Sequence, residues 1–256
     1  MSGAPRAVIG VLAVLAALAF AVEPAAAQSL SLDLGDGGGS VTGRIFQLML
    51  LVTVLSVAPG ILVMVTSFTR IVVVLAFLRT ALGLQTTPPN TVLVSLALFL
   101  TLFVMAPVFE ESYEAGIKPL LAEEIEEMEA LERAAAPVHA FMRAHVRAKD
   151  VALFMDLAQV GEVEEPAALP YRVLIPAFMI SELRRAFEIG FLVYLPFLII
   201  DMVVASILMS MGMMMLPPVM ISLPFKLIFF VLVDGWYLVV GSLVESYATV
   251  GGLAGG

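Results

Sequence analysis

The sequence predicts an all-α protein of the membrane class, with four long apolar helices in kinked hairpins and a small helical insertion. Of its 256 residues, 61% are hydrophobic and only 14% are charged, whereas soluble domains carry about 25% charged residues. The mean hydropathy is +1.05. Four apolar runs each approach the ~20 residues that a helix needs to cross a bilayer. Together these features predict that most of the chain belongs in a membrane.

The composition also excludes several classes of function. A formal net charge of −9 argues against nucleic acid as a partner, because its recognition needs a basic surface. The chain has no cysteine, so it offers no disulfide, thiolate nucleophile or Cys-ligated metal site. His139 and His145 are spaced for nearly opposite helix faces, and we expect them to be surface or boundary residues. Hydrolase, zinc and phosphate-binding motifs are missing, so we expect no enzyme activity, no metal and no cofactor.

Residues 1–27 have the form of a secretory signal peptide. Arg6 supplies a positive charge before an apolar run over 7–22, and three alanines at 25–27 follow. Small residues at these positions favour cleavage after Ala27. The alternative is an uncleaved first membrane helix. Residues 28–43 are polar and rich in glycine, so we expect a mobile exported tail there.

The apolar runs group into two helical hairpins, residues 44–109 and 173–247. The first hairpin contains runs over 45–65 and 91–109, joined by a segment over 68–82 that is itself helical in pattern. The second contains runs over 187–208 and 219–244. A mature N-terminus outside the cell places the insertion, residues 110–172, on the periplasmic side, with the C-terminal tail, residues 248–256, also outside. Arg70 and Arg79 in the first connection agree with the positive-inside rule.

The insertion is acidic and helical in pattern. Residues expected to form one apolar face recur at helical spacing: Leu121, Ile125, Met128, Leu131 and Ala135. The glutamates between them predict a solvated face, with a specific docking surface as the alternative. Pro137 is expected to end this helix, and Asp150 is expected to cap a later one.

Seven charged residues in or beside the second hairpin are expected to be buried or to meet another subunit: Glu182, Arg184, Arg185, Glu188, Asp201, Lys226 and Asp234. An unpaired charge that faces lipid costs several kcal/mol. Helical spacing allows two local pairs, Glu182–Arg185 and Arg184–Glu188. A bond between Asp201 and Lys226 within one hairpin is the simplest account of those two residues. Pairing between subunits and a proton-linked carboxylate are the alternatives.

A methionine-rich turn joins the last two apolar runs. Five methionines fall within seven residues: Met209, Met211, Met213, Met214 and Met215. Gly212, Pro217 and Pro218 are the expected hinge, because glycine loosens the backbone and proline disfavours a continuing helix. Methionine is flexible and polarizable, so it adapts to partners of different shape. The run is either core packing inside a helical bundle or a deformable seal around something that passes through.

Motifs along both hairpins carry a family resemblance. The first hairpin contains FTRIVVVL (68–75), LGLQ (82–85) and PPN (88–90). The second contains PAFMISELRRAFEIG (176–190), LPFLIID (195–201), MSMGMMM (209–215), SLPFK (222–226) and VDGW (233–236). In this order they resemble the FliP family of flagellar type III protein export gates. Injectisome relatives share these motifs, and the signal peptide favours the flagellar branch.

The resemblance implies a structural, pore-forming subunit without catalytic residues. Family members form a pentamer, a ring or spiral homo-oligomer that joins a related FliR-type subunit and small two-helix FliQ-type subunits. Unfolded flagellar proteins pass through this gate across the inner membrane at the flagellar basal body. The methionine run then corresponds to the gasket of the pore, and the seven charges to contacts between subunits. A small-solute transporter or channel subunit, and an assembly factor that never contacts substrate, are alternatives.

Overall fold

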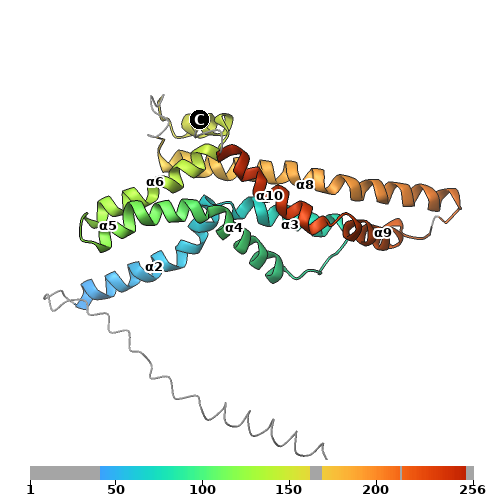
Figure 1. Cartoon of the computed structure of the whole chain (residues 1–256), viewed down its shortest axis with the longest axis horizontal. Coiled ribbons are helices and arrows are strands. Elements are labelled where there is room, and N and C mark those ends of the chain that lie inside the picture. The colour runs from blue at the N-terminus through green and yellow to red at the C-terminus, as the bar shows by residue number, and fades with distance from the viewer. Residues whose placement is uncertain (1–40, 162–168, 214, 252–256) are drawn as a thin grey trace, which may run out of the picture. The chain divides into compact units, whose positions relative to one another are not determined.

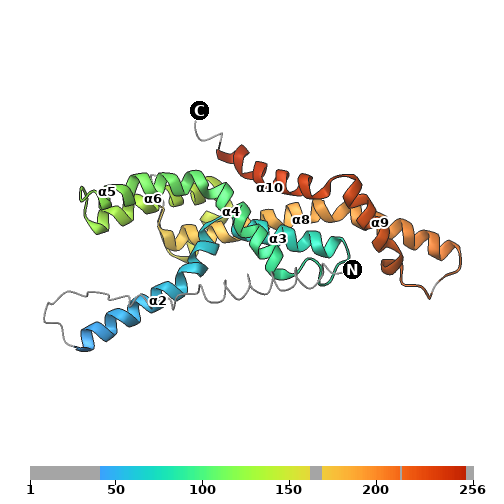
Figure 2. The same cartoon turned by 60° about the horizontal axis from the view of Figure 1, so that its bottom comes forward.

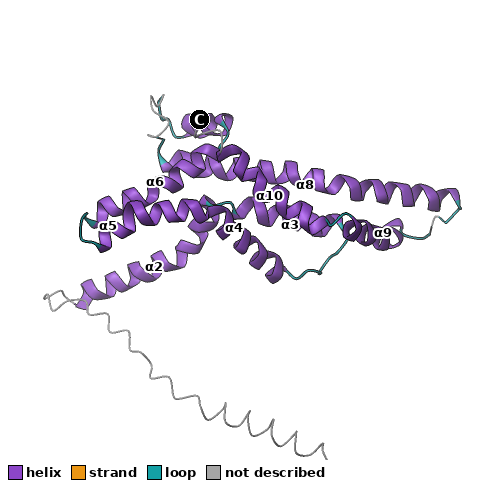
Figure 3. Cartoon of the chain, in the orientation of Figure 1, coloured by secondary structure: helices purple, strands orange, loops and turns teal. Residues whose placement is uncertain are grey.

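A computed structural model describes residues 41–161, 169–213 and 215–251, and within these ranges every regular element is a helix (Figures 1 and 3). Two compact units divide the chain at Val54 and Leu55. The predicted signal peptide and most of the predicted tail lie outside the described residues, as does Met214. The helices are α2 (Val41–Val65), α3 (Phe68–Ala81), α4 (Asn90–Ser112), the π-helix η1 (Tyr113–Ile117), α5 (Lys118–Leu121), α6 (Glu127–His145), α7 (Ala148–Leu157), α8 (Tyr171–Ser210), α9 (Pro218–Leu232) and α10 (Gly235–Gly251).

Three helical stretches are long and apolar enough to cross a membrane: 48–65, 90–121 and 171–210. Helices α9 and α10 form a fourth span if they are counted together, although the chain bends by 63° between them. The fourth apolar run, predicted over 219–244, is therefore two helices joined by a bend. The break falls at Asp234, whose φ is +50°, in a left-handed region that aspartate tolerates better than most residues.

Two helices are longer than the sequence predicts, because proline does not end them. Helix α6 continues through Pro137 to His145, and α8 runs for 40 residues through Pro176 and Pro196. Most helix stability in proteins comes from tertiary packing rather than from local propensity. Pro137 is itself buried, with Phe141 and Met142 packed into the core one turn later. This packing on the far side of the proline offsets its local cost.

The short helix α3 lies at the centre of the core. Its Ile71, Val74 and Leu75 are completely buried, and they belong to an apolar cluster that also draws on α4, α8, α9 and α10. Figures 1 and 2 show α3 beside the middle of α8. The two helices approach so closely that a Cβ at Gly190 would lie 2.6 Å from Phe77. A segment that looks like a connection in the sequence is thus the element around which the hairpins pack.

The predicted apolar face of the insertion is not one face of a single helix, and it does not enter the core. Met128 and Leu131 are 69% and 65% exposed, whereas Ala130 and Phe141 of the same helix are buried. Leu121 and Ile125 are not on α6 at all, because a turn with a left-handed Glu123 separates α5 from α6. The face of α6 that carries Phe141 enters the core instead.

Candidate functional site

The methionine-rich turn lies at the end of the α8–α9 hairpin, and its local sequence determines its geometry. Helix α8 ends at Ser210 with Met211 as its cap residue, and Gly212 follows with a left-handed φ of +74°. The Gly212 amide donates to the Met209 carbonyl at 3.1 Å, and the Met213 amide donates to the Leu208 carbonyl at 3.0 Å. These two bonds form a Schellman motif, which satisfies carbonyls at the helix end. Pro217 and Pro218 then begin α9, where a missing amide proton costs nothing.

The described methionine side chains of this turn point away from the protein core. Met209, Met211 and Met213 are 59%, 62% and 43% exposed, and Met215 is 98% exposed. Within one chain they are therefore not core packing. They form a flexible apolar surface at the end of two long apolar helices.

An ion pair joins the last quarter of α8 to the middle of α9. Lys226 Nζ donates to Asp201 Oδ2 at 2.7 Å and to the Ala81 carbonyl at 3.1 Å. The Ser222 hydroxyl donates to Asp201 Oδ1 at 2.5 Å. Lys226 is buried, while the Asp201 side chain keeps 23% of its surface. The structure thus brings these two residues together within one chain, and it joins α8 and α9 to the end of α3.

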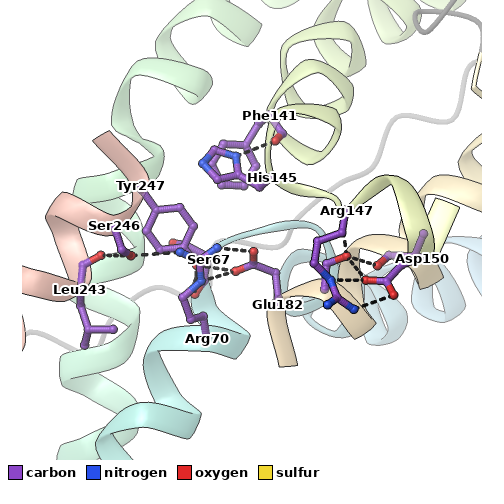
Figure 4. Close-up of polar contacts among 12 residues, drawn as sticks. Ser67, Arg70, Phe141, His145, Arg147, Asp150, Glu182, Leu243, Ser246 and Tyr247 are labelled. Atoms are coloured by element: carbon purple, nitrogen blue, oxygen red, sulfur yellow. Dashed lines mark hydrogen bonds and ion pairs between the residues drawn. The ribbon is translucent and has the colours of Figure 1, made fainter. Parts of the chain in front are cut away.

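Glu182 pairs with a residue that sequence spacing did not suggest. Its carboxylate binds the guanidinium of Arg70 on α3 through two hydrogen bonds, from Nε at 2.9 Å and from Nη2 (Figure 4). The predicted pair of Glu182 with Arg185 is wrong, because the packing of α3 on α8 places a buried arginine against Glu182. Arg185 lies one turn further along α8 and is only half-buried.

A third helix, α10, also contacts this ion pair. The Tyr247 hydroxyl donates to Glu182 Oε2 at 2.5 Å, and the guanidinium carbon of Arg70 lies 3.8 Å from the centre of the Tyr247 ring. Arg70 Nη1 also donates to the Ser246 hydroxyl at 3.0 Å. A buried arginine and a buried glutamate thus satisfy each other and hold α3, α8 and α10 together.

The remaining predicted charges lie nearer to the surface. Arg184 and Glu188 form the expected pair at 2.8 Å, but both side chains are more than half exposed. Asp234 is exposed at the break between α9 and α10, and its carboxylate has no hydrogen bond or ion pair with the described residues. Of the seven charges, only Glu182 and Lys226 are buried within one chain.

His145 was expected to be a surface or boundary residue, but the structure buries it at the end of α6. The residue is 3% exposed, its Nδ1 lies 2.8 Å from the Phe141 carbonyl, and its Nε2 has no partner among the described residues. Its ring is 5.2 Å from that of Tyr247. Burial lowers the pKa of His145 below its ordinary value, against the opposing effect of the Phe141 carbonyl. One feature of the sequence points to this burial: His145 follows Phe141 by four residues, so the two side chains lie on the same face of the helix.

Asp150 lies in the first turn of α7 rather than at its cap, so that prediction is wrong. Arg147 occupies the cap position and binds the Asp150 carboxylate at 2.7 and 2.8 Å. The Ser181 hydroxyl donates to Asp150 Oδ2 at 2.5 Å. Burial would raise the pKa of Asp150, but the bonds from Ser181 and Arg147 outweigh it and lower the pKa. This cluster fixes the start of α7 to α8.

No group of three metal-ligating side chains occurs in the part of the chain that the structure describes. The described chain instead contains buried ion pairs that hold the helices together, and an exposed methionine turn.

Comparisons with known proteins agree on one family. Residues 51–243 match the FliP family. The chain is 62% identical over 240 residues to the flagellar biosynthetic protein FliP of Caulobacter vibrioides, covering 93% of this chain and 90% of that one. Proteins of the same name from Bacillus subtilis and Rhizobium meliloti are 58% and 56% identical, covering 78% and 87% of this chain and 91% and 93% of theirs. This chain belongs to the FliP family.

Proposed function

We propose that the chain is a pore-forming structural subunit of the flagellar type III export gate in the bacterial inner membrane. In this function it passes unfolded flagellar proteins toward the growing flagellum and catalyses no reaction. The relatives named as flagellar biosynthetic proteins support a role in building flagella. They also favour the flagellar gate over a virulence injectisome.

The observation that carries the proposal is the exposure of the methionine turn. An exported chain presents side chains of every size, so a seal around it must adapt without binding one sequence. Four described methionines are exposed at the tip of one hairpin, and their unbranched side chains adjust to varied shapes. Met214 lies outside the described residues and completes the run in the sequence. A turn of this kind, repeated in each copy of an oligomer, supplies a ring of adaptable side chains.

The proposal includes a homo-oligomer, a pentamer that associates with FliR-type and FliQ-type subunits. Large apolar side chains along α8 and α9, among them Ile199, Val203 and Phe225, are exposed in the single chain. They line an open apolar groove between the two helices, which lipid or neighbouring subunits can cover. In this arrangement the insertion lies on the periplasmic side, and the hairpins are the parts that assemble.

Two other functions predict different properties of the same turn. A small-solute transporter needs a specific polar binding site at the midplane of the membrane, for which a methionine cluster is a poor candidate. An assembly factor that never contacts substrate predicts that exported chains pass without touching the turn. The described part of the chain contains no convergent polar group at the turn that favours the transporter.

Capture of a stalled substrate tests the proposal. The natural chain has no cysteine, so a single Met211→Cys variant can be cross-linked to a flagellar protein that a folded domain arrests during export. A matched control is Leu157→Cys, which is also exposed but lies on α7. We expect capture at position 211 and none at 157. Equal capture at both positions, or none at 211 while the substrate is arrested, would contradict the proposal.

A further inference from the structure

His145 is a buried titratable residue that the proposed export function does not use. It ends α6, and its Nδ1 lies 2.8 Å from the Phe141 carbonyl. Because a carbonyl oxygen only accepts, Nδ1 carries the proton of the neutral ring, and Nε2 is the unprotonated nitrogen. Nε2 is buried and has no partner among the described residues. A proton that binds there in acid therefore finds no acceptor for its hydrogen bond.

Several helices meet at His145 (Figure 4). The ring of Tyr247 on α10 has its centre 5.2 Å from that of His145. Helix α4 and the end of α2 contribute only the apolar Met105 and Val65 to the cluster around Tyr247. Helices α3 and α8 bring the three charged groups whose fields act on His145: Arg70, Glu182 and Arg185. Two of these are cations, and the carboxylate already binds one of them. A positive charge on His145 is therefore poorly compensated.

The other charged groups near this junction do not improve the compensation. Arg147 is bound to Asp150, and Arg143 lines the open groove on another face of α6. Glu245 precedes Tyr247 by two residues, which places it on a different face of α10, where it is exposed.

The contact of Tyr247 is the weakest polar link of the junction. Its hydroxyl donates to Glu182 Oε2 as a neutral group, whereas Arg70 and Glu182 form a bidentate, charge-assisted pair with bonds roughly twice as strong. The guanidinium carbon of Arg70 already lies 3.8 Å from the centre of the Tyr247 ring, so a charged His145 places a second cation beside that ring. If α10 moves away, water reaches Nε2 and screens both cations, while the pair of Arg70 with Glu182 stays intact.

We propose that protonation of His145 releases α10 from its junction with α3, α6 and α8, so that the docking of this helix is a pH-sensitive switch. Burial lowers the pKa of His145, so the docked helix keeps the ring neutral. Once α10 leaves, water restores the ordinary pKa of 6.5, and the ring takes up a proton. Proton uptake and helix release are thus linked, and acid favours the released state.

The insertion contains His145, so in the proposed topology the switch responds to pH on the periplasmic side. That side depends on the proposed function, whereas the release of α10 does not. At about pH 5.5 a histidine of ordinary pKa is roughly 90% protonated. The population of released helix therefore rises by up to about tenfold over its value at about pH 8.

Amide hydrogen exchange of the full-length protein in detergent measures the opening of each helix. Wild type and His145→Gln are compared at the same pH, so that the intrinsic pH dependence of exchange cancels. In α10, over 239–248, the ratio of the wild-type rate to the variant rate should rise several-fold from about pH 8 to about pH 5.5. In wild type at both pH values, α10 should exchange faster than α8 over 178–190, because α10 opens while the rest stays folded.

The matched control variant is His139→Gln. His139 also lies on α6, but its Nε2 lies 2.8 Å from the Leu169 carbonyl, away from the junction, so this variant should keep the full response to acid. If His145→Gln does not fold, wild type alone tests the proposal. Its exchange in α10, divided by the intrinsic rate of an unstructured chain at the same pH, must then rise between the two conditions.

Three results overturn the proposal. One is an equal effect of acid on α10 in wild type and in His145→Gln, or no effect in wild type. Another is equal exchange in α10 and α8, which would mean that α10 opens only when the whole protein unfolds. The third is loss of the acid response in His139→Gln.

Discussion

Glu182 binds the guanidinium of Arg70 through two hydrogen bonds, although the residues are 112 positions apart, and both side chains are removed from solvent. The pair joins the short central helix α3 to the longest helix, α8, and Tyr247 adds α10. A buried charge without its partner is costly. Any packing of α3, α8 and α10 that separated Glu182 from Arg70 would therefore be strongly disfavoured.

Loss of either member of this pair should destabilise the protein strongly. Arg70→Ala leaves the Glu182 carboxylate buried without its cation, which costs on the order of 3–5 kcal/mol in the free energy of unfolding. The matched control is Arg184→Ala, which breaks an exposed, solvent-screened pair with Glu188 that contributes little to stability. Thermal unfolding of the purified protein in detergent measures both. Equal, small shifts for the two variants would show that the buried pair does not hold the helices.

Stability should fall in acid because of His145. Burial keeps the pKa of this residue below its ordinary value of 6.5, so between those two values the unfolded chain binds more protons than the folded one. The free energy of unfolding therefore falls as the pH drops through about 6.5. Asp150 acts in the same direction, but only near its more acidic ordinary pKa of 3.8.

The measurement is the melting temperature of the wild type and of His145→Gln at about pH 8 and about pH 5.5, which bracket the ordinary histidine pKa. The wild type should lose more stability than the variant between these two conditions. Identical losses would assign the acid sensitivity to other groups.

The two partners of the Asp201–Lys226 pair should not be equivalent. Asp201→Ala strands a lysine that is 3% exposed, whereas Lys226→Ala leaves a carboxylate that retains 23% of its surface and still accepts from Ser222. We expect both changes to reduce the assembled oligomer on native gels, with Asp201→Ala the more severe. Exchanging the two residues should restore part of the assembly if their contact is direct. Intact assembly and motility in both single variants would refute the role of the pair.

The sequence was sufficient to predict the class of fold and the charge pair within one hairpin. Apolar runs of membrane length are a local property, and Asp201 and Lys226 face each other across a single turn. The Schellman ending at Gly212 is also local. These features depend on residues that lie close together in the chain.

The features that sequence reasoning missed depend on tertiary packing. Arg185 lies at a helical spacing from Glu182 that suits an ion pair. Because α3 packs on α8, however, Glu182 binds Arg70 instead. Helix α6 has apolar residues on two faces, and periodicity alone did not decide which face enters the core. The choice depends on Phe141 and Met142, which meet α8 and α10 in the structure.

The mature protein should begin near Gln28. The prediction depends on the short apolar run and on the alanines that precede Gln28, which together favour cleavage by signal peptidase. N-terminal sequencing of the membrane-extracted protein checks it. A chain that still begins at Met1 would contradict the prediction and add a membrane segment to the topology.

The methionine turn provides the most direct test of the central claim, that a deformable seal closes the pore. Alanine at Met209, Met211 and Met213 would remove flexible volume from every copy of the proposed oligomer at once. Leucine at the same positions keeps the volume but adapts less readily, because its side chain is branched. The measurement is leakage of small solutes into cells that carry the assembled gate, together with the amount of flagellar protein secreted into the medium. The account predicts that the alanine variant assembles and leaks, and that the leucine variant stays tight but exports less. An alanine variant that assembles, stays tight and exports normally would contradict it.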